Sequence, residues 1–211
     1  MAIYQSMFGN YERESTVADV SLNVTDGVHN SVNDNPESEY LLLSCKNIKG
    51  GSLSIGDSER RIDKETFEKL RKRTRLAKGD VLLSSVGTIG ELLLVNFEPD
   101  NIEFQRSVAI IKPNPACVSP AYLYEALLDQ KQEIIHAGHG AVQQCIFISD
   151  IAGFPIHKPD ESELASFNAV VNPMMDTIIA NQNESNRLVA LRDSLLPKLM
   201  SGELDVSDLE L

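Results

Sequence analysis

The sequence predicts an α+β protein, in which a strand-rich globular domain is followed by one long helix. Short apolar runs separated by turn residues fill residues 16–157, which is typical of strands. Apolar residues recur at heptad spacing through residues 161–200, which is typical of a helix that packs along another helix. The chain has 211 residues, enough for one good domain and an appendage.

The long helix carries one continuous apolar seam. With Leu164 at heptad position a and Phe167 at d, eight of the eleven a/d positions are apolar. A helix from Pro173 to Leu196 would be about 36 Å long. We therefore expect it to pair with another copy or another subunit rather than fold back on its own domain. The candidate dimer residues are Leu164, Phe167, Val171, Met174, Ile178, Leu188 and Leu195.

The ends of this helix are predicted from capping residues. Asn172 before Pro173 fits an N-cap with proline at the first helical position, so 161–171 would be a separate lead-in helix. Pro197 should bend or end the helix near Leu196, and Gly202 is a natural stop.

The globular part reads as strands joined by polar turns. Alternation and short apolar runs predict strands at 16–24, 40–45, 81–86, 91–95, 108–112, 145–148 and 154–157. Residues 47–56 should form a Gly/Ser-rich hairpin or loop, and residues 87–90 a turn. Asp63 should cap a short helix over 63–73, and 120–137 has helical spacing. Pro159 closes the domain.

Composition indicates a soluble globular protein of the cytoplasm. Apolar residues make up 42% and charged residues 24% of the chain, and no 18-residue apolar run is present. The N-terminal residues lack a secretory pattern. Cys45, Cys117 and Cys145 are far apart and odd in number, which fits reduced thiols and no metal site.

The net charge of −12 is unevenly distributed. Residues 41–112 hold thirteen Lys or Arg against ten acidic residues, whereas residues 161–211 hold three against nine. Six of the ten residues in 69–78 are Lys or Arg. Such a run is either a solvated helix face or a patch that contacts nucleic-acid phosphates, and the run alone favours neither.

Enzyme signatures are missing from the sequence. It contains no GxGxxG, no GxxxxGK[ST] and no GxSxG. His136 and His139 flank Gly138 without a third ligand nearby, so we expect them to face solvent rather than bind metal. Nothing in the pattern supplies a positioned acid and base.

Several segments together resemble the specificity subunit of type I restriction–modification enzymes. In order they are DGVH (26–29), LLLSCKNIKGG (41–51), LAKGDVLLSSVGTIGELLLV (76–95), FQRSVAIIKP (104–113), GHGAVQQCIFISDIAGFPIHKP (138–159) and NESNRLVALRDSLLPKLMSGELDVSDLEL (183–211). The resemblance runs from about residue 16 to 211, and it is carried mainly by the GTIG stretch and the LRDSLLPKLMSGEL ending.

The resemblance implies a target-recognition, DNA-binding domain at 1–159. It implies a helical spacer at 160–204, which dimerises and docks the methyltransferase, and an acidic tail at 205–211. A specificity subunit is not catalytic and has no cofactor of its own. Its implied partners are double-stranded DNA, a methyltransferase (modification) subunit that uses S-adenosylmethionine, and a restriction subunit. No membrane is implied.

A full specificity subunit carries two recognition domains and two helical regions, whereas this sequence shows one of each. It therefore resembles a half-subunit, or the second half of a full one, and residues 2–11 look like the end of an incoming helix in a truncated reading frame. We expect a homodimer through antiparallel C-terminal helices, reading two inverted half-sites. Pairing with a different half-subunit is the alternative.

DNA contacts are predicted from side-chain chemistry, because cations bind phosphates and bidentate polar groups read base edges. The phosphate candidates are Lys46, Lys49, Arg71, Arg73, Arg75 and Lys78. The base-edge candidates are Asn47, Thr88, Gln105, Arg106, Gln143 and Gln144. Each could instead be a structural turn or a solvated surface side chain.

Two other hypotheses are open at this point. One is a dimeric coiled-coil adaptor whose globular domain binds protein rather than DNA. The other is an enzyme of unrecognised type.

Overall fold

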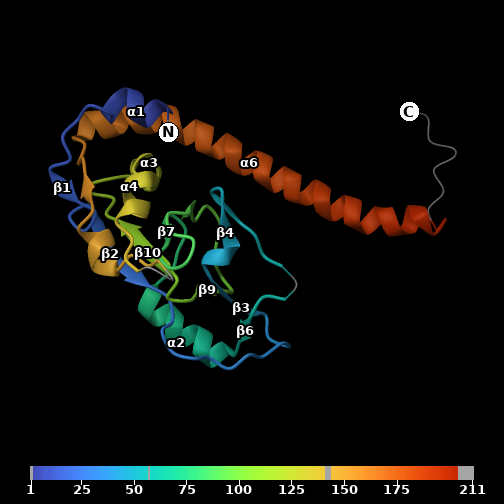
Figure 1. Ribbon diagram of the computed structural model, residues 1–211. Coiled ribbons are helices and arrows are strands. Elements are labelled where there is room, and N and C mark those ends of the chain that lie inside the picture. The colour runs from blue at the N-terminus through green and yellow to red at the C-terminus, as the bar shows by residue number, and fades with distance from the viewer. Residues whose placement is uncertain (1, 57, 141–143, 204–211) are drawn as a thin grey trace, which may run out of the picture. The chain divides into compact units, whose positions relative to one another are not determined.

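The computed structural model describes residues 2–56, 58–140 and 144–203. Backbone contacts divide the chain into a globular unit up to Ala169 and a second unit from Val170 on, and each is described by itself. Figure 1 shows the helices and strands of the chain.

The larger sheet of the globular unit is antiparallel, with strand order β2-β10-β7-β8. Its strands are β2 (Ser21–Asp26), β7 (Val81–Ser84), β8 (Leu92–Leu94) and β10 (Val108–Pro113). The central strands are apolar on both faces: all four residues of β7 and the first four of β10 are buried. β10 pairs Ala109 with Asp26 on one side and with Leu83 on the other.

A smaller sheet has the order β6-β3-β9, with β3 and β9 parallel. Its strands are β3 (Tyr40–Leu43), β6 (Arg61–Ile62) and β9 (Ile102–Phe104). Between β3 and β6 lie the 3-10 turn Cys45–Asn47 and a hairpin of β4 (Ile48–Lys49) and β5 (Ser52–Leu53). The first short strand, β1 (Ser15–Thr16), pairs with the last, β11 (Pro155–Ile156).

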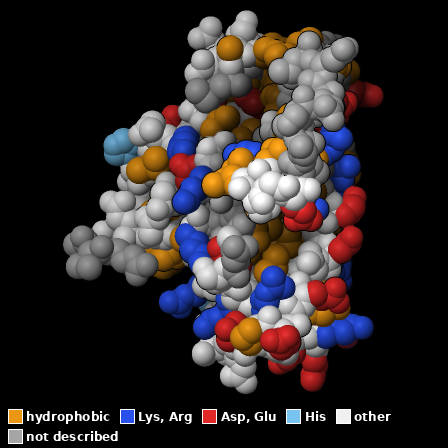
Figure 2. Space-filling view, turned by 90° about the vertical axis from the view of Figure 1, so that its right-hand side faces the viewer, with side chains coloured by type: hydrophobic (Ala, Val, Ile, Leu, Met, Phe, Trp, Pro, Cys, Tyr) orange, Lys and Arg blue, Asp and Glu red, His pale blue; other side chains and the backbone are white. Residues whose placement is uncertain are grey.

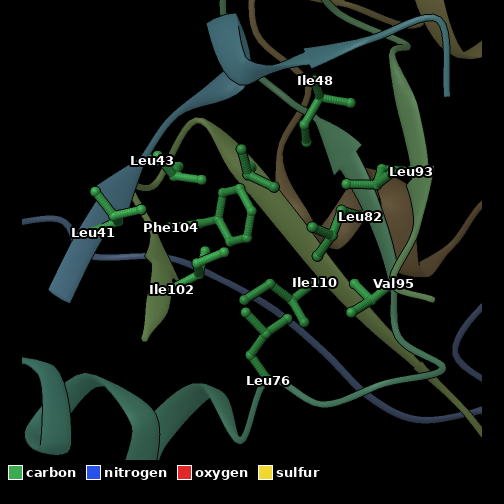
Figure 3. Close-up of a cluster of buried hydrophobic side chains, with 11 residues drawn as sticks. Leu41, Leu43, Ile48, Leu76, Leu82, Leu93, Val95, Ile102, Phe104 and Ile110 are labelled. Atoms are coloured by element: carbon green, nitrogen blue, oxygen red, sulfur yellow. The ribbon is translucent and has the colours of Figure 1, made fainter. Parts of the chain in front are cut away.

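The main core lies between the two sheets (Figure 3). Phe104 of β9, 1% exposed, points between Leu43 and Leu82, and Ile48 and Leu76 lie on either side of this layer. The aromatic ring therefore joins residues from β3, β7 and the β4 hairpin, and burial of these apolar groups stabilises the packing of the sheets at about 25 cal/mol per Å².

Helices cover the sheets on different sides. They are α1 (Ala2–Phe8), α2 (Lys64–Thr74), α3 (Pro120–Asp129), α4 (Lys131–His136) and α5 (Ile148–Ala152). α3 packs on β7 and β8, whereas α2 packs on β9. Tyr4 and Phe8 of α1 meet Tyr122 of α3 and Phe167, with ring centroids 5.2–6.5 Å apart.

A buried ion pair fixes α2 to β9. The Glu103 side chain is fully buried, and the Arg71 Nε donates to it at 2.5 Å. Arg71 Nη2 also donates to the carbonyls of Pro99 and Ile102, and Thr74 Oγ1 lies 3.0 Å from the carboxylate. Burial raises the pKa of Glu103, and its bonds to Arg71 and Thr74 oppose that shift.

The long helix is α6 (Glu161–Met200). It is continuous through Pro173 and Pro197. A separate lead-in helix over 161–171 and a helix end near Leu196 are therefore wrong, whereas a kink at Pro173 or a bend at Pro197 stays a prediction. An interior proline removes one hydrogen bond but does not have to end a helix whose other bonds persist. The predicted stop at Gly202 is confirmed, since this residue has φ +73° and donates to the Leu199 carbonyl.

Most of the predicted strands and helices are present, with shifted ends. The single strand predicted at 16–24 is wrong: β1 and β2 are separate strands, because a turn at 17–20, closed by the Asp19 amide donating to the Thr16 carbonyl, lies between them. The strand predicted at 145–148 is wrong: Cys145 makes only isolated bridges to Val86 and His139, and α5 begins at Ile148 because Asp150 accepts from the Phe147 amide. The short strands β6 and β9 were not predicted. The helix predicted at 120–137 is present as α3 and α4, with Gln130 between them.

Arg71→Met should lower the free energy of unfolding by about 3–5 kcal/mol, because it leaves the Glu103 carboxylate buried without its partner. Adding Glu103→Leu should recover most of that loss. Urea denaturation followed by circular dichroism measures both. Lys72→Met, an exposed neighbour on α2, is the matched control. An Arg71→Met variant as stable as this control would rule out the ion pair as a stabilising contact.

Candidate nucleic-acid interface

Four loops meet at one end of the two sheets. They follow β2, β3, β7 and β9. Residues 105–107, which form the loop after β9, are joined by hydrogen bonds to the loops after β2 and β7 and to the last residue of β3. The Arg106 amide donates to the Val28 carbonyl at 3.0 Å, and the Gln105 amide donates to Leu43 at 2.8 Å. The Ser85 amide donates to the Ser107 carbonyl at 2.9 Å. Side chains from segments far apart in sequence therefore share one surface.

This surface carries two adjoining depressions with volumes of about 500 and 210 Å³. Both are lined by Val28–Val32, and we call them together the basic groove. Four cations line it: Lys69 and Arg73 from α2, together with Arg60 and Arg106. Among the described residues that line the groove, none carries a carboxylate. Figure 2 shows Lys and Arg side chains at several places on one face of the molecule, with Asp and Glu side chains among them.

Asp26, at the end of β2, is bound by two groups of the groove. The His29 Nε2 lies 2.7 Å from Asp26 Oδ2, and Arg73 Nη1 lies 3.6 Å from Oδ1. Arg73 Nη2 also donates to the Gly27 carbonyl. The Asp26 side chain is only 13% exposed, whereas that of His29 is 59% exposed. The Asp26 carboxylate therefore does not line the groove itself, whereas the side chains of His29 and Arg73 that contact it do.

A third depression, of about 280 Å³, lies beside the β4–β5 hairpin. Lys46, Lys49 and Thr88 line it, so the structure brings these three candidates together. Glu91 anchors the hairpin: its Oε2 accepts from the Gly50 amide at 2.9 Å, and its Oε1 accepts from Lys131 at 2.5 Å. The bond to Lys131 lowers the pKa of Glu91.

Two candidates have structural roles instead. Asn47 is 2% exposed, accepts from the Ser44 amide and donates to the Ser54 carbonyl, so it closes a turn and does not reach a base. The Nε and Nη2 groups of Arg71 donate to Glu103, Pro99 and Ile102 inside the domain. We therefore remove both from the proposed interface. Sequence alone did not show that these polar groups are satisfied inside the domain.

The other candidates divide by position. Gln105 and Arg106 line the basic groove. Gln144 is exposed, and its own backbone carbonyl accepts from the Gly87 amide. Gln143 lies outside the described residues. Lys46 is paired with Glu59 at 3.0 Å but keeps 61% of its side chain exposed.

Arg75 and Lys78 lie at the other end of β7. The Arg75 carbonyl accepts from Lys112, which also binds Asp80 just before β7, whereas Thr88 follows this strand. Both side chains are exposed. Their role as phosphate contacts stays a prediction, separate from the groove.

The sequence reading missed Arg60, Lys69, His29 and Asn30, which line the groove. Lys69 was within the basic run but was not chosen. The DGVH segment (26–29) was noted only as a resemblance. Its polar pair Asp26 and His29, with glycine between them, was the signal that could have pointed to a built site.

Among the residues with assigned positions, no group of three or more His, Cys, Asp or Glu could hold a metal ion. No helix among them is long and apolar enough to span a membrane.

Comparisons with known proteins agree with this fold. No protein-family model matches the chain. The type I restriction enzyme MjaIX specificity subunit of Methanocaldococcus jannaschii is 32% identical over 115 residues, which are 54% of this chain and 27% of the relative.

Two solved structures share the fold of this chain. The type I restriction–modification S subunit from M. genitalium matches with a TM-score of 0.58 and 20% identity, covering 89% of this chain and 45% of that one. The HsdS subunit from Thermoanaerobacter tengcongensis matches with a TM-score of 0.55 and 15% identity, covering 96% and 50%.

The chain is similar to type I specificity subunits. The resemblance and the α+β fold predicted from the sequence are therefore confirmed. The chain spans about a quarter of the length of the curated specificity subunit and about half that of the two solved ones.

Gly27→Ala should disrupt this end of the domain. A Cβ at Gly27 would lie 1.9 Å from the Phe104 carbonyl oxygen, so the loop after β2 must move away from Gln105. We expect a loss of about 1–3 kcal/mol or more in the free energy of unfolding, measured by urea denaturation. Gly56→Ala, whose Cβ would meet only Glu59 at 3.7 Å, is the matched control. Equal stability of the two variants would contradict the close packing of this loop.

Proposed function

We propose that this chain is a sequence-specific DNA-recognition subunit of a type I restriction–modification system and that it is not itself catalytic. The observation that carries the proposal is the basic groove, with four cations and no carboxylate in its lining. The similarity to specificity subunits supports the same function.

Charge distribution makes DNA the best ligand for this groove. The whole chain has a net charge of −12, so a general attraction to polyanions is not expected. Cations gathered at one end of the sheets can still bind phosphates, while amides such as Gln105 and Asn30 can read base edges. A protein-binding adaptor is not favoured, because its surface would not need such a groove.

We propose that the partners are a methyltransferase subunit, which carries S-adenosylmethionine, and a restriction subunit. The second unit offers the surface for assembly: Met174, Ile178 and Leu188 are about half exposed, and Leu195 is partly exposed. Phe167 and Val171 of the predicted seam are buried and Leu164 is half-buried, so the dimer surface would be formed by residues from Met174 on. Two copies pairing antiparallel would bring two recognition domains to inverted half-sites.

The test of this function is the methylation pattern of cells that express the chain with its cognate methyltransferase subunit. An interrupted palindrome would support a homodimer, and an asymmetric bipartite motif would support pairing with a different half-subunit. No new methylation in a system that is otherwise competent would contradict the proposal.

Arg60→Ala with Arg106→Ala should weaken DNA binding and flatten its salt dependence. Each lost phosphate contact lowers the log–log slope by about 0.9, so a reduction of about two is expected. Fluorescence anisotropy at several salt concentrations measures the slope. Arg75→Ala with Lys78→Ala removes the same charge at the far end of β7 and is the matched comparison. An unchanged slope in the Arg60/Arg106 variant would remove the groove from the interface.

Ile178→Glu with Leu188→Glu should convert a homodimer to a monomer in sedimentation experiments, because charges at half-exposed apolar positions oppose helix pairing. The unfolding of the globular unit should not change. Asn183→Glu with Ser194→Glu, both exposed positions of the same helix, is the control. A dimer that survives the first pair of substitutions but not the second would assign pairing to another face.

A further inference from the structure

We propose that His29 reads one base pair of the target by accepting a hydrogen bond, and that Asp26 positions it for this. The inference rests on the proposed DNA-recognition function and deepens it. It starts from the contact between the His29 Nε2 and Asp26 Oδ2, which are 2.7 Å apart.

The backbone beneath His29 is held in place on both sides. The Val28 amide donates to the Phe104 carbonyl at 3.0 Å, and the Val28 carbonyl accepts from the Arg106 amide at 3.0 Å. Gly27 allows this approach, since a Cβ there would collide with the Phe104 carbonyl. The imidazole is therefore presented from a fixed strand end, with 59% of its side chain still exposed toward solvent.

The carboxylate also fixes which ring nitrogen carries the hydrogen. A neutral imidazole whose Nε2 faces a carboxylate has its hydrogen on Nε2 and its lone pair on Nδ1. Nδ1 then accepts a hydrogen bond from a partner in the groove. In the major groove, the base edges that donate are the amino groups of adenine and cytosine.

The Lys and Arg side chains that line the groove cannot accept a hydrogen bond. Arg60, Lys69, Arg73 and Arg106 only donate, and no carboxylate lines the surface. Cations of this kind recognise guanine and phosphate oxygens. The side chains that can accept from adenine or cytosine are His29, the amides of Asn30 and Gln105, and the hydroxyls of Ser31 and Thr66. Of these, only His29 is held by a carboxylate.

Arg73 completes the arrangement from α2. It lies 3.6 Å from Asp26 Oδ1 and bonds the Gly27 carbonyl, so it neutralises the carboxylate that would otherwise repel DNA phosphates. Asp26 is thus a positioning residue, which acts through His29 and Arg73 and does not itself line the groove.

The test uses the full chain in complex with its methyltransferase subunit and a pool of DNA duplexes with a randomised segment. Bound sequences are compared for the unmodified chain and for His29→Ala, His29→Gln and Asp26→Asn. We expect His29→Ala to lower the preference for adenine or cytosine at one position about tenfold, with the other positions unchanged. His29→Gln keeps an acceptor and should retain part of that preference.

Asp26→Asn should reduce the preference at the same position, because an amide can donate to Nε2 as well as accept from it, so the tautomer is no longer fixed. The same substitution removes a negative charge, so affinity for unrelated DNA should rise, whereas a merely structural loss would lower both affinities. His136→Ala, an exposed histidine bonded to its own helix, is the control.

An unchanged motif in His29→Ala, or a uniform loss of binding in every His29 variant that still folds, would overturn the assignment. If the unmodified complex selects no motif, the proposed DNA recognition fails instead. The two failures are therefore distinguishable.

Discussion

The hydrogen bonds made by residues 104–107 are the constraint on which the rest of this end of the domain depends. This short segment joins β9 to β10, and it binds the segments after β2, β3 and β7 through Val28, Leu43 and Ser85. Phe104 anchors the segment in the core between the sheets. Because both halves of the fold meet there, polar side chains from distant parts of the sequence are held on one rigid surface.

The same arrangement explains how an acidic chain can offer a cationic surface. Three acidic groups of the globular unit are held by cations: Glu103 is buried with Arg71, Asp80 binds Lys112 and Glu91 binds Lys131. Burial raises the pKa of Asp80, and its bond to Lys112 opposes that shift. None of these three carboxylates lines the groove, in which Arg60, Lys69, Arg73 and Arg106 are the lining Lys and Arg residues.

Much of the fold followed from local pattern. The apolar run of β7, the Gly50-Gly51 hairpin and the cap before α2 each depend on a few neighbouring residues, so their sequence signals were sufficient. β6 and β9 are only two and three residues long and pair with β3 across a long stretch of chain, so no local period marks them. The site was predicted in part for the same reason. Gln105 and Arg106 were chosen as polar loop residues and lie in the groove lining, and their contact with DNA stays a prediction. The burial of Asn47 and the partners of Arg71 depend on tertiary contacts, which no local pattern shows.

The prolines of α6 show the opposite case, in which a strong local signal was overridden. Asn172-Pro173 has the chemistry of a helix start, yet the helix passes through it and Thr177 Oγ1 donates to the Pro173 carbonyl. Each interior proline removes one backbone donor, which weakens the helix by about 3 kcal/mol if nothing compensates. A lone helix that carries two such losses and exposes Met174, Ile178 and Leu188 gains little from its own bonds alone. Apolar burial against another helix would stabilise it, which is the physical reason to expect a partner along it.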